Sequence, residues 1–118
     1  MSKFVILRDV NGLFYFELET ENGRVILTGE SHINKHLCIR NIEAVKANIS
    51  NDRYYSKDSL LGGYYFRLKA RNGHVICLSP NYKNKAKMEK GIECIKINAP
   101  GAAIVEQFSR KTRIIQRE

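Results

Sequence analysis

Apolar and polar positions alternate along residues 14–19, which predicts a strand with one apolar and one polar face. The short apolar run from Phe4 to Leu7 precedes it, and residues 24–28 follow it after Asn22-Gly23, a dipeptide typical of hairpin turns. Between the first two segments, Asn11-Gly12 predicts a tight turn with positive φ at both central positions. The chain therefore opens with a predicted three-stranded antiparallel meander.

The hydrophobic period changes from two to 3.6 after Gly29. Apolar residues then recur at i, i+4, i+7 and i+11, which places them in one stripe along a helix: Cys38, Ile42, Val45 and Ile49. Asn34 is the expected N-cap, because its amide oxygen can accept from the free N–H groups of the first turn. Asn48 is expected to close the helix in the left-handed conformation. One unit is therefore three strands followed by a helix.

The whole unit returns fifty positions later without a gap. Identical pairs include Tyr15/Tyr65, Phe16/Phe66, Leu18/Leu68, Asn22/Asn72, Gly23/Gly73, Val25/Val75, Ile26/Ile76, Ile42/Ile92, Lys46/Lys96 and Asn48/Asn98. The second helix has its own stripe, cap and stop: Met88, Ile92, Ile95 and Ala99, with Asn84 before them and Pro100 after. Its first strand is expected at residues 53–57 and a last strand at residues 102–108. The chain is a tandem repeat of one supersecondary unit.

The second repeat carries a recognisable set of motifs. They are Tyr65-Phe66-Arg67-Leu68-Lys69, Asn72-Gly73, Val75-Ile76, Tyr82 and the run from Gly91 to Pro100. In this spacing, and duplicated, they resemble the YegP-like proteins over nearly the whole chain up to residue 108. The resemblance implies two β-β-β-α-β units in one sheet, with their last strands exchanged and both helices on one face. It implies no catalytic residues, since none is established for that family.

The first repeat departs from this family pattern at three places. His32 stands where the family has tyrosine, Asn41 where it has glycine, and Ile49-Ser50 where it has Ala-Pro. A glycine at the helix position permits close approach to the sheet. Asn41 is therefore expected to hold its helix further off or to find a partner.

A fifty-residue unit alone buries too little surface to be stable, so the two repeats are expected to share one core. The predicted fold class is α+β, with two tandem repeats forming one mostly antiparallel sheet and two helices on one face. Residues 1–108 are expected to form a single domain, with the repeats at about 3–50 and 53–108. Residues 109–118 are expected to be a basic, mobile tail.

The net charge of +8 lies entirely in the second half of the chain. Residues 1–50 carry six basic and six acidic residues, whereas residues 51–118 carry fourteen and six, so 14 − 6 = +8. The three cysteines are odd in number and lack zinc-site spacing, which favours a reducing compartment. The first apolar run is too short for a signal peptide or a membrane span. A soluble, cytoplasmic protein is expected.

The repeats differ most in one row of charges. Glu17, Glu19 and Glu21 in the first repeat align with Arg67, Lys69 and Arg71 in the second. If the two central strands are neighbours, these rows would form inter-repeat ion pairs, each contributing about 0.2–1 kcal/mol. Alternatively, the basic row binds an anion.

A second basic group lies in the second repeat. Lys83, Lys87 and Lys90 recur at helical spacing, and Arg110, Lys111 and Arg113 follow in the tail. Dense basic residues neutralise phosphates, so these six, with the basic row, are the predicted polyanion or nucleic-acid footprint. The competing interpretation is an ordinary solvated helix face.

The remaining candidate chemistry is weak. His32 and His36 lie at i and i+4 but lack a third metal ligand, and no nucleophile elbow or phosphate-binding glycine loop is present. No metal, cofactor or catalysis is expected. Ile33 and Leu37 replace two of the lysines in the first repeat, and they either pack under a loop or form an interface. The predicted function is a non-enzymatic polyanion or nucleic-acid binding module, and the alternative is a protein-interaction or homodimerisation module.

Overall fold

The structure is a computed structural model, and it describes residues 1–107. The helices and strands follow along the chain as β1 (Lys3–Arg8), β2 (Phe14–Glu19), β3 (Val25–Gly29), α1 (Lys35–Asn48), the 3-10 helix η1 (Asp52–Tyr54), β4 (Tyr55–Leu60), β5 (Gly63–Lys69), β6 (Val75–Leu78), α2 (Lys85–Asn98) and β7 (Ala103–Glu106). The predicted mobile tail at 109–118 lies outside the described residues.

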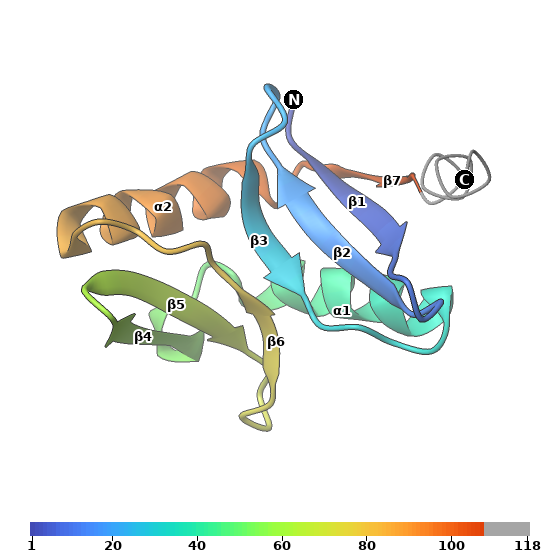
Figure 1. The fold of residues 1–118 in the computed structure, drawn as a ribbon, viewed down its shortest axis with the longest axis horizontal. Coiled ribbons are helices and arrows are strands. Elements are labelled where there is room, and N and C mark those ends of the chain that lie inside the picture. The colour runs from blue at the N-terminus through green and yellow to red at the C-terminus, as the bar shows by residue number, and fades with distance from the viewer. Residues whose placement is uncertain (108–118) are drawn as a thin grey trace.

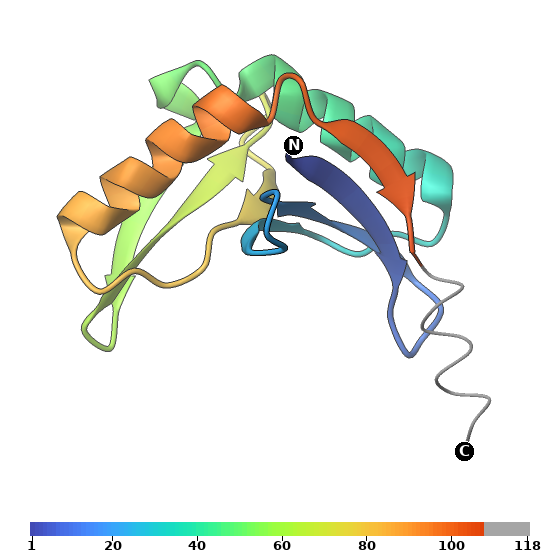
Figure 2. The same ribbon diagram turned by 90° about the horizontal axis from the view of Figure 1, so that it is seen from above.

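The seven strands form one sheet in the order β4-β5-β6-β3-β2-β1-β7, and both helices lie on the same side of it (Figures 1 and 2). All neighbouring strands are antiparallel except β1 and β7. The repeats meet in the middle, where β3 pairs with β6 through Thr28 opposite Leu78 and Gly29 opposite Cys77. The predicted α+β class is confirmed, with one mostly antiparallel sheet and two helices.

Strand exchange occurs at one end of the sheet. β7 follows α2 of the second repeat but pairs with β1 of the first, from Lys3 opposite Ala103 to Ile6 opposite Glu106. After α1, by contrast, the chain passes through η1 directly into β4. The strand predicted at 53–57 therefore begins two residues later, at Tyr55, because a 3-10 turn occupies residues 52–54.

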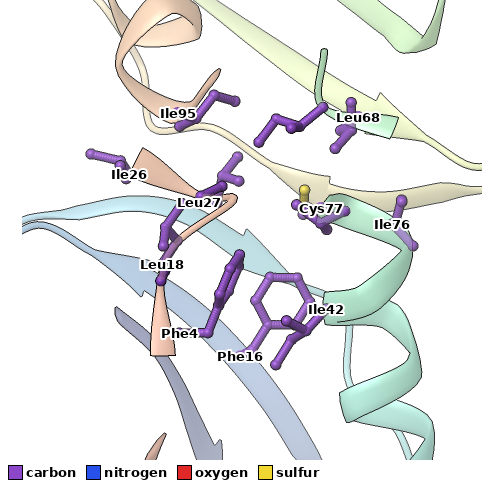
Figure 3. Close-up of a cluster of buried hydrophobic side chains, with 14 of the residues drawn as sticks. Phe4, Phe16, Leu18, Ile26, Leu27, Ile42, Leu68, Ile76, Cys77 and Ile95 are labelled. Atoms are coloured by element: carbon purple, nitrogen blue, oxygen red, sulfur yellow. The ribbon is translucent and has the colours of Figure 1, made fainter. Parts of the chain in front are cut away.

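One hydrophobic core extends under both repeats. The two predicted helix stripes are buried in it, together with the apolar faces of β1, β2, β3, β5 and β6. Figure 3 shows Phe4, Phe16 and Ile42 from the first repeat close to Leu68, Cys77 and Ile95 from the second. The Phe4 and Phe16 rings meet edge to face with their centroids 5.7 Å apart.

The helix starts are as predicted, and α2 ends before Pro100 as expected, but the predicted left-handed closure is absent. The amide oxygen of Asn34 accepts from the N–H of Leu37 at 2.9 Å, and that of Asn84 accepts from the N–H of Lys87 at 2.8 Å. Asn48 is still helical, and the C-cap residue Ile49 is right-handed, with its N–H bonded to the Val45 carbonyl. The left-handed closure is therefore wrong, because the α-helical hydrogen bonding continues past Asn48.

The turn at Asn11-Gly12 is longer than predicted. Five residues separate β1 from β2, and among them only Gly12 has positive φ, at 80°. The carboxylate of Asp9 accepts from the N–H groups of Asn11 and Leu13 at 2.9 and 3.0 Å. A tight two-residue hairpin is therefore wrong, since Asp9 organises a wider loop.

Candidate anion-binding site

The two opposite charge rows do not meet. β3 and β6 lie between β2 and β5, so Glu17, Glu19 and Glu21 are not opposite Arg67, Lys69 and Arg71. The predicted cross-strand ion pairs between repeats are therefore wrong. Arg67 instead pairs within its own repeat, with Asp58 at 3.4 Å and the Ser56 hydroxyl at 3.2 Å. Glu21 pairs with the N-terminal ammonium at 2.6 Å.

The other two members of the basic row line an open recess. Lys69 and Arg71 surround it with Arg53 and Tyr54, and its volume is about 550 Å³. The recess lies where η1 meets the turn between β5 and β6. Arg67 is not part of its wall, so the predicted row divides into a paired arginine, a half-buried Lys69 and an exposed Arg71.

A smaller pocket collects the lysines of α2. It lies between α2 of the second repeat and the turn between β2 and β3 of the first, with a volume of about 310 Å³. Its wall consists of Thr20, Arg24, Ile26, Tyr82, Lys87, Lys90, Gly91 and Cys94. The predicted residue Lys83 precedes α2 and is not in this wall, and Arg110, Lys111 and Arg113 lie outside the described residues.

Local backbone contacts fix the floor of the pocket. The N–H and carbonyl of Tyr82 bond with the carbonyl and N–H of Tyr64, at 2.7 and 2.9 Å, which fixes the position of Tyr82. Its ring lies against Gly91, where an added Cβ would collide with the hydroxyl oxygen. The side chain is only 8% exposed, and this burial raises the pKa of the Tyr82 hydroxyl, with Arg24 opposing the change.

Three cations converge on this floor. Lys87 and Lys90 lie at i and i+3 on α2, and so share one helix face, while Arg24 approaches from the other repeat. All three are exposed, and none forms an ion pair with any residue of the described chain. The arrangement therefore favours an anion between the two repeats.

The corresponding place in the other half has different chemistry. Arg24, Lys87 and Gly91 align with His74, Leu37 and Asn41, and only Lys90 has a basic counterpart, Arg40. Here the side-chain nitrogens of His32 and Asn41 hydrogen bond at 2.6 Å. The expectation that Asn41 finds a partner is confirmed. The described residues therefore do not form the same basic pocket at the aligned positions of the other half.

Sequence reasoning found Lys87 and Lys90, with Tyr82 as a stacking surface beside them, but missed Arg24 and Cys94 as members of the same site. Arg24 is a single arginine after a turn glycine, and nothing in the sequence places it beside α2 of the other repeat. The half-buried Cys94 lines the pocket, whereas Cys38 and Cys77 are buried. Burial raises the pKa of the Cys38 thiol to about 11 and that of Cys77 further.

Neither a cluster of metal ligands nor a membrane-spanning helix is found in the described part of the chain. No three or more His, Cys, Asp and Glu side chains gather there as metal ligands. No helix among residues 1–107 has both the length and the apolar character needed to cross a membrane.

The fold is that of a small tandem-repeat α+β protein: two copies of one unit share a sheet, and a basic pocket lies between them. The chain belongs to the DUF1508 family, described as a domain of unknown function, whose model matches twice, at residues 9–56 and 61–106. The two matches follow the two repeats. They bear out the resemblance to the YegP-like proteins.

Two solved structures share the fold. A UPF0339 protein from Shewanella oneidensis has a TM-score of 0.83 and 30% identity, with 89% of this chain and 90% of that chain covered. The yegP protein from E. coli, described as a protein of unknown function, has a TM-score of 0.85 and 29% identity, with 91% and 93% covered.

Two relatives match by sequence. A UPF0339 protein from Methanosarcina acetivorans is 50% identical over 53 residues, which are 45% of this chain and 91% of the relative. That relative is therefore about one repeat long. A UPF0339 protein from the ptx operon 5′ region of Stutzerimonas stutzeri is 40% identical over 54 residues, 46% of this chain and about half (49%) of the relative.

Proposed function

We propose that this chain is a non-enzymatic, cytoplasmic binding module that holds neighbouring phosphates of single-stranded nucleic acid at the pocket between its repeats, one phosphate for each of its three cations. The supporting observation is the convergence of Arg24, Lys87 and Lys90 on one pocket without ion pairs to residues 1–107. Phosphate neutralisation is the interaction that such exposed cations supply.

The uncharged part of the wall favours a single strand over a duplex. Ile26, Gly91 and the ring of Tyr82 are buried but expose a small apolar area to the pocket next to the cations. An unstacked nucleotide can place its phosphate on the cations and its base or sugar on this surface. The bases of a duplex stay stacked, so a duplex presents only phosphates. The pocket is therefore expected to bind single strands more tightly.

The test is a residue-resolved NMR titration of the full chain with a short single-stranded and a short double-stranded oligonucleotide. With three phosphates neutralised, a plot of log binding constant against log salt concentration should have a slope near −2 for single strands. The affinity should therefore fall roughly 20-fold between 50 and 200 mM salt. Arg24→Gln with Lys87→Gln should reduce that slope by about 1.4. Shifts should cluster around the pocket.

The matched control removes the same charge elsewhere. Lys69→Gln with Arg71→Gln lowers the net charge equally at the open recess, and it should leave the salt slope unchanged. Nucleic acid bound at the pocket should also slow modification of Cys94 by a neutral thiol reagent. Equal losses from both double variants, without protection of Cys94, would mean that the charge acts unspecifically.

A second candidate function is self-association through α1. Ile33 is 77% exposed and Leu37 is 37% exposed, so Ile33 is not packed under a loop. An exposed apolar pair at a helix start fits a protein contact. Light scattering tests this candidate, because a dimer has about twice the 13.6 kDa mass of one chain. The Ile33→Lys variant should have the mass of a single chain. A mass of one chain for the unmodified protein removes this candidate.

A further inference from the structure

The outer edge of β4 has no partner strand among the described residues, although the equivalent edge of β1 does. β1 and β4 occupy the same place in their repeats, since Ile6 lies opposite Phe16 and Lys57 lies opposite Phe66. β7 covers the edge of β1. No strand within residues 1–107 covers β4 in this way, because the chain after α1 turns directly into β4 itself.

The backbone of β4 is arranged to accept another strand. The N–H and carbonyl of Phe66 both bond toward Ser79, at 2.9 and 3.0 Å. Because antiparallel bonding alternates along a strand, the opposite residue, Lys57, directs its own N–H and carbonyl to the free edge. At the covered edge the equivalent carbonyl, that of Ile6, accepts from the N–H of Gln107 at 3.0 Å.

A side-chain anchor is also repeated. At the covered edge, Lys35 at the start of α1 pairs with Glu106 of β7 at 2.7 Å. The equivalent residue at the start of α2 is Lys85. Lys85 is exposed and has no ion pair with any residue of the 1–107 segment. At the free edge, Lys85 is thus the counterpart of Lys35, but no carboxylate of the described chain takes the role of Glu106 there.

Copies of this chain cannot fill these edges by exchanging β7. Within the described residues, each molecule supplies one exchanged strand, β7, and has two edges that accept one, so exchange of β7 alone leaves one edge per molecule free. We propose that the β4 edge binds an extended segment of another protein, added parallel to β4. Its chemistry should match β7, with two aliphatic residues followed by an acidic residue that pairs with Lys85. This is β-strand addition to an exposed sheet edge.

Lys57 limits what can bind. A lysine on an edge strand disfavours indiscriminate pairing with other sheets. Its ammonium group pairs with Glu89 of α2 at 2.9 Å, on the helix side of the sheet. The backbone of β4 thus stays open to a segment that matches the Lys85 anchor, while the charge opposes aggregation.

The probe is a synthetic peptide with the sequence of residues 101–107, blocked at both ends. It is titrated into the isotope-labelled full chain, in which β7 already occupies β1. Amide shifts should saturate along Tyr55–Leu60 and at the start of α2. The amides of Lys3–Arg8 should stay in place.

Two matched comparisons test the mechanism. Lys57→Pro removes the outward N–H and should weaken peptide binding at least fivefold, whereas Lys57→Ala keeps this N–H and should stay within twofold. Proline is tolerated at an edge position whose N–H faces solvent, and thermal unfolding of both variants checks the fold. Lys85→Ala, or Glu106→Gln in the peptide, should each weaken binding roughly two- to fivefold, with no further loss when combined.

Three outcomes would overturn the proposal. The first is the absence of shifts at millimolar peptide. The second is shifts along Lys3–Arg8 instead of β4, which would mean that the peptide displaces the chain's own β7. The third is equal weakening by Lys57→Pro and Lys57→Ala, which would assign the effect to the lysine charge rather than to strand addition.

Discussion

Replacing Gly29 with alanine is expected to lower the free energy of unfolding by about 3 kcal/mol, the upper end of the usual cost of overpacking a core. A Cβ at this position would collide with the ring of Phe16. That ring is fully buried and meets Phe4 edge to face, so it has no free space to move into. Gly29 also pairs with Cys77 where the two repeats join, which leaves its backbone little room to shift. Chemical denaturation followed by circular dichroism measures the loss.

The collision can be separated from a general effect of alanine. Gly101→Ala is the matched control, because an added Cβ there meets nothing within 4 Å, and it should change stability by less than about 0.5 kcal/mol. In a Phe16→Leu background, Gly29→Ala should cost about 1 kcal/mol or less, because the smaller side chain leaves space. An unchanged cost in that background would assign the effect to the backbone instead of the ring.

If the His32–Asn41 pair is introduced at the aligned positions 82 and 91, the two substitutions should affect the free energy of unfolding in a strongly non-additive way. Gly91→Asn alone is expected to cost about 1–3 kcal/mol, since the new side chain collides with Tyr82. Tyr82→His alone should cost a similar amount, because a well-buried ring is replaced by a smaller one. Together the two changes recreate a hydrogen bond that is 2.6 Å long in the first repeat. The double variant should therefore be at least about 1 kcal/mol more stable than the sum of the two losses predicts.

The four proteins of this cycle are compared by denaturant unfolding under one set of conditions. Strictly additive losses would show that the two positions do not depend on each other. The double variant also alters the basic pocket, since Tyr82 and Gly91 belong to its wall and Gly91→Asn adds a side chain there. Weaker oligonucleotide binding by the double variant, with its fold intact, would agree with the proposed site.

Local sequence patterns predicted the elements of this fold well. Alternation located β2 and β5, the 3.6-residue period located α1 and α2, and both asparagine N-caps are present. Each of these features depends on neighbours within a few residues. The duplication added the long-range information that both units share one sheet and one core.

The order of strands could not be read in the same way. Opposite charges suggested that β2 and β5 meet, but the repeats join through β3 and β6. Exposed charge pairs contribute little compared with the burial of apolar side chains at the junction. The pocket was hidden for a related reason: Arg24 joins Lys87 only after the second helix has packed beside a turn of the first repeat. Contacts between distant segments decide both features.

The pairing of β7 with β1 joins the last described strand to the first. A chain emerges from the ribosome with its N-terminus first, so β1, β2 and β3 are made long before β7. Until residues 103–106 follow, the outer edge of β1 is an unpaired strand edge open to other chains. Completion of the first repeat therefore depends on synthesis of the second. During translation, the newly made N-terminal half is the part that most needs protection from aggregation.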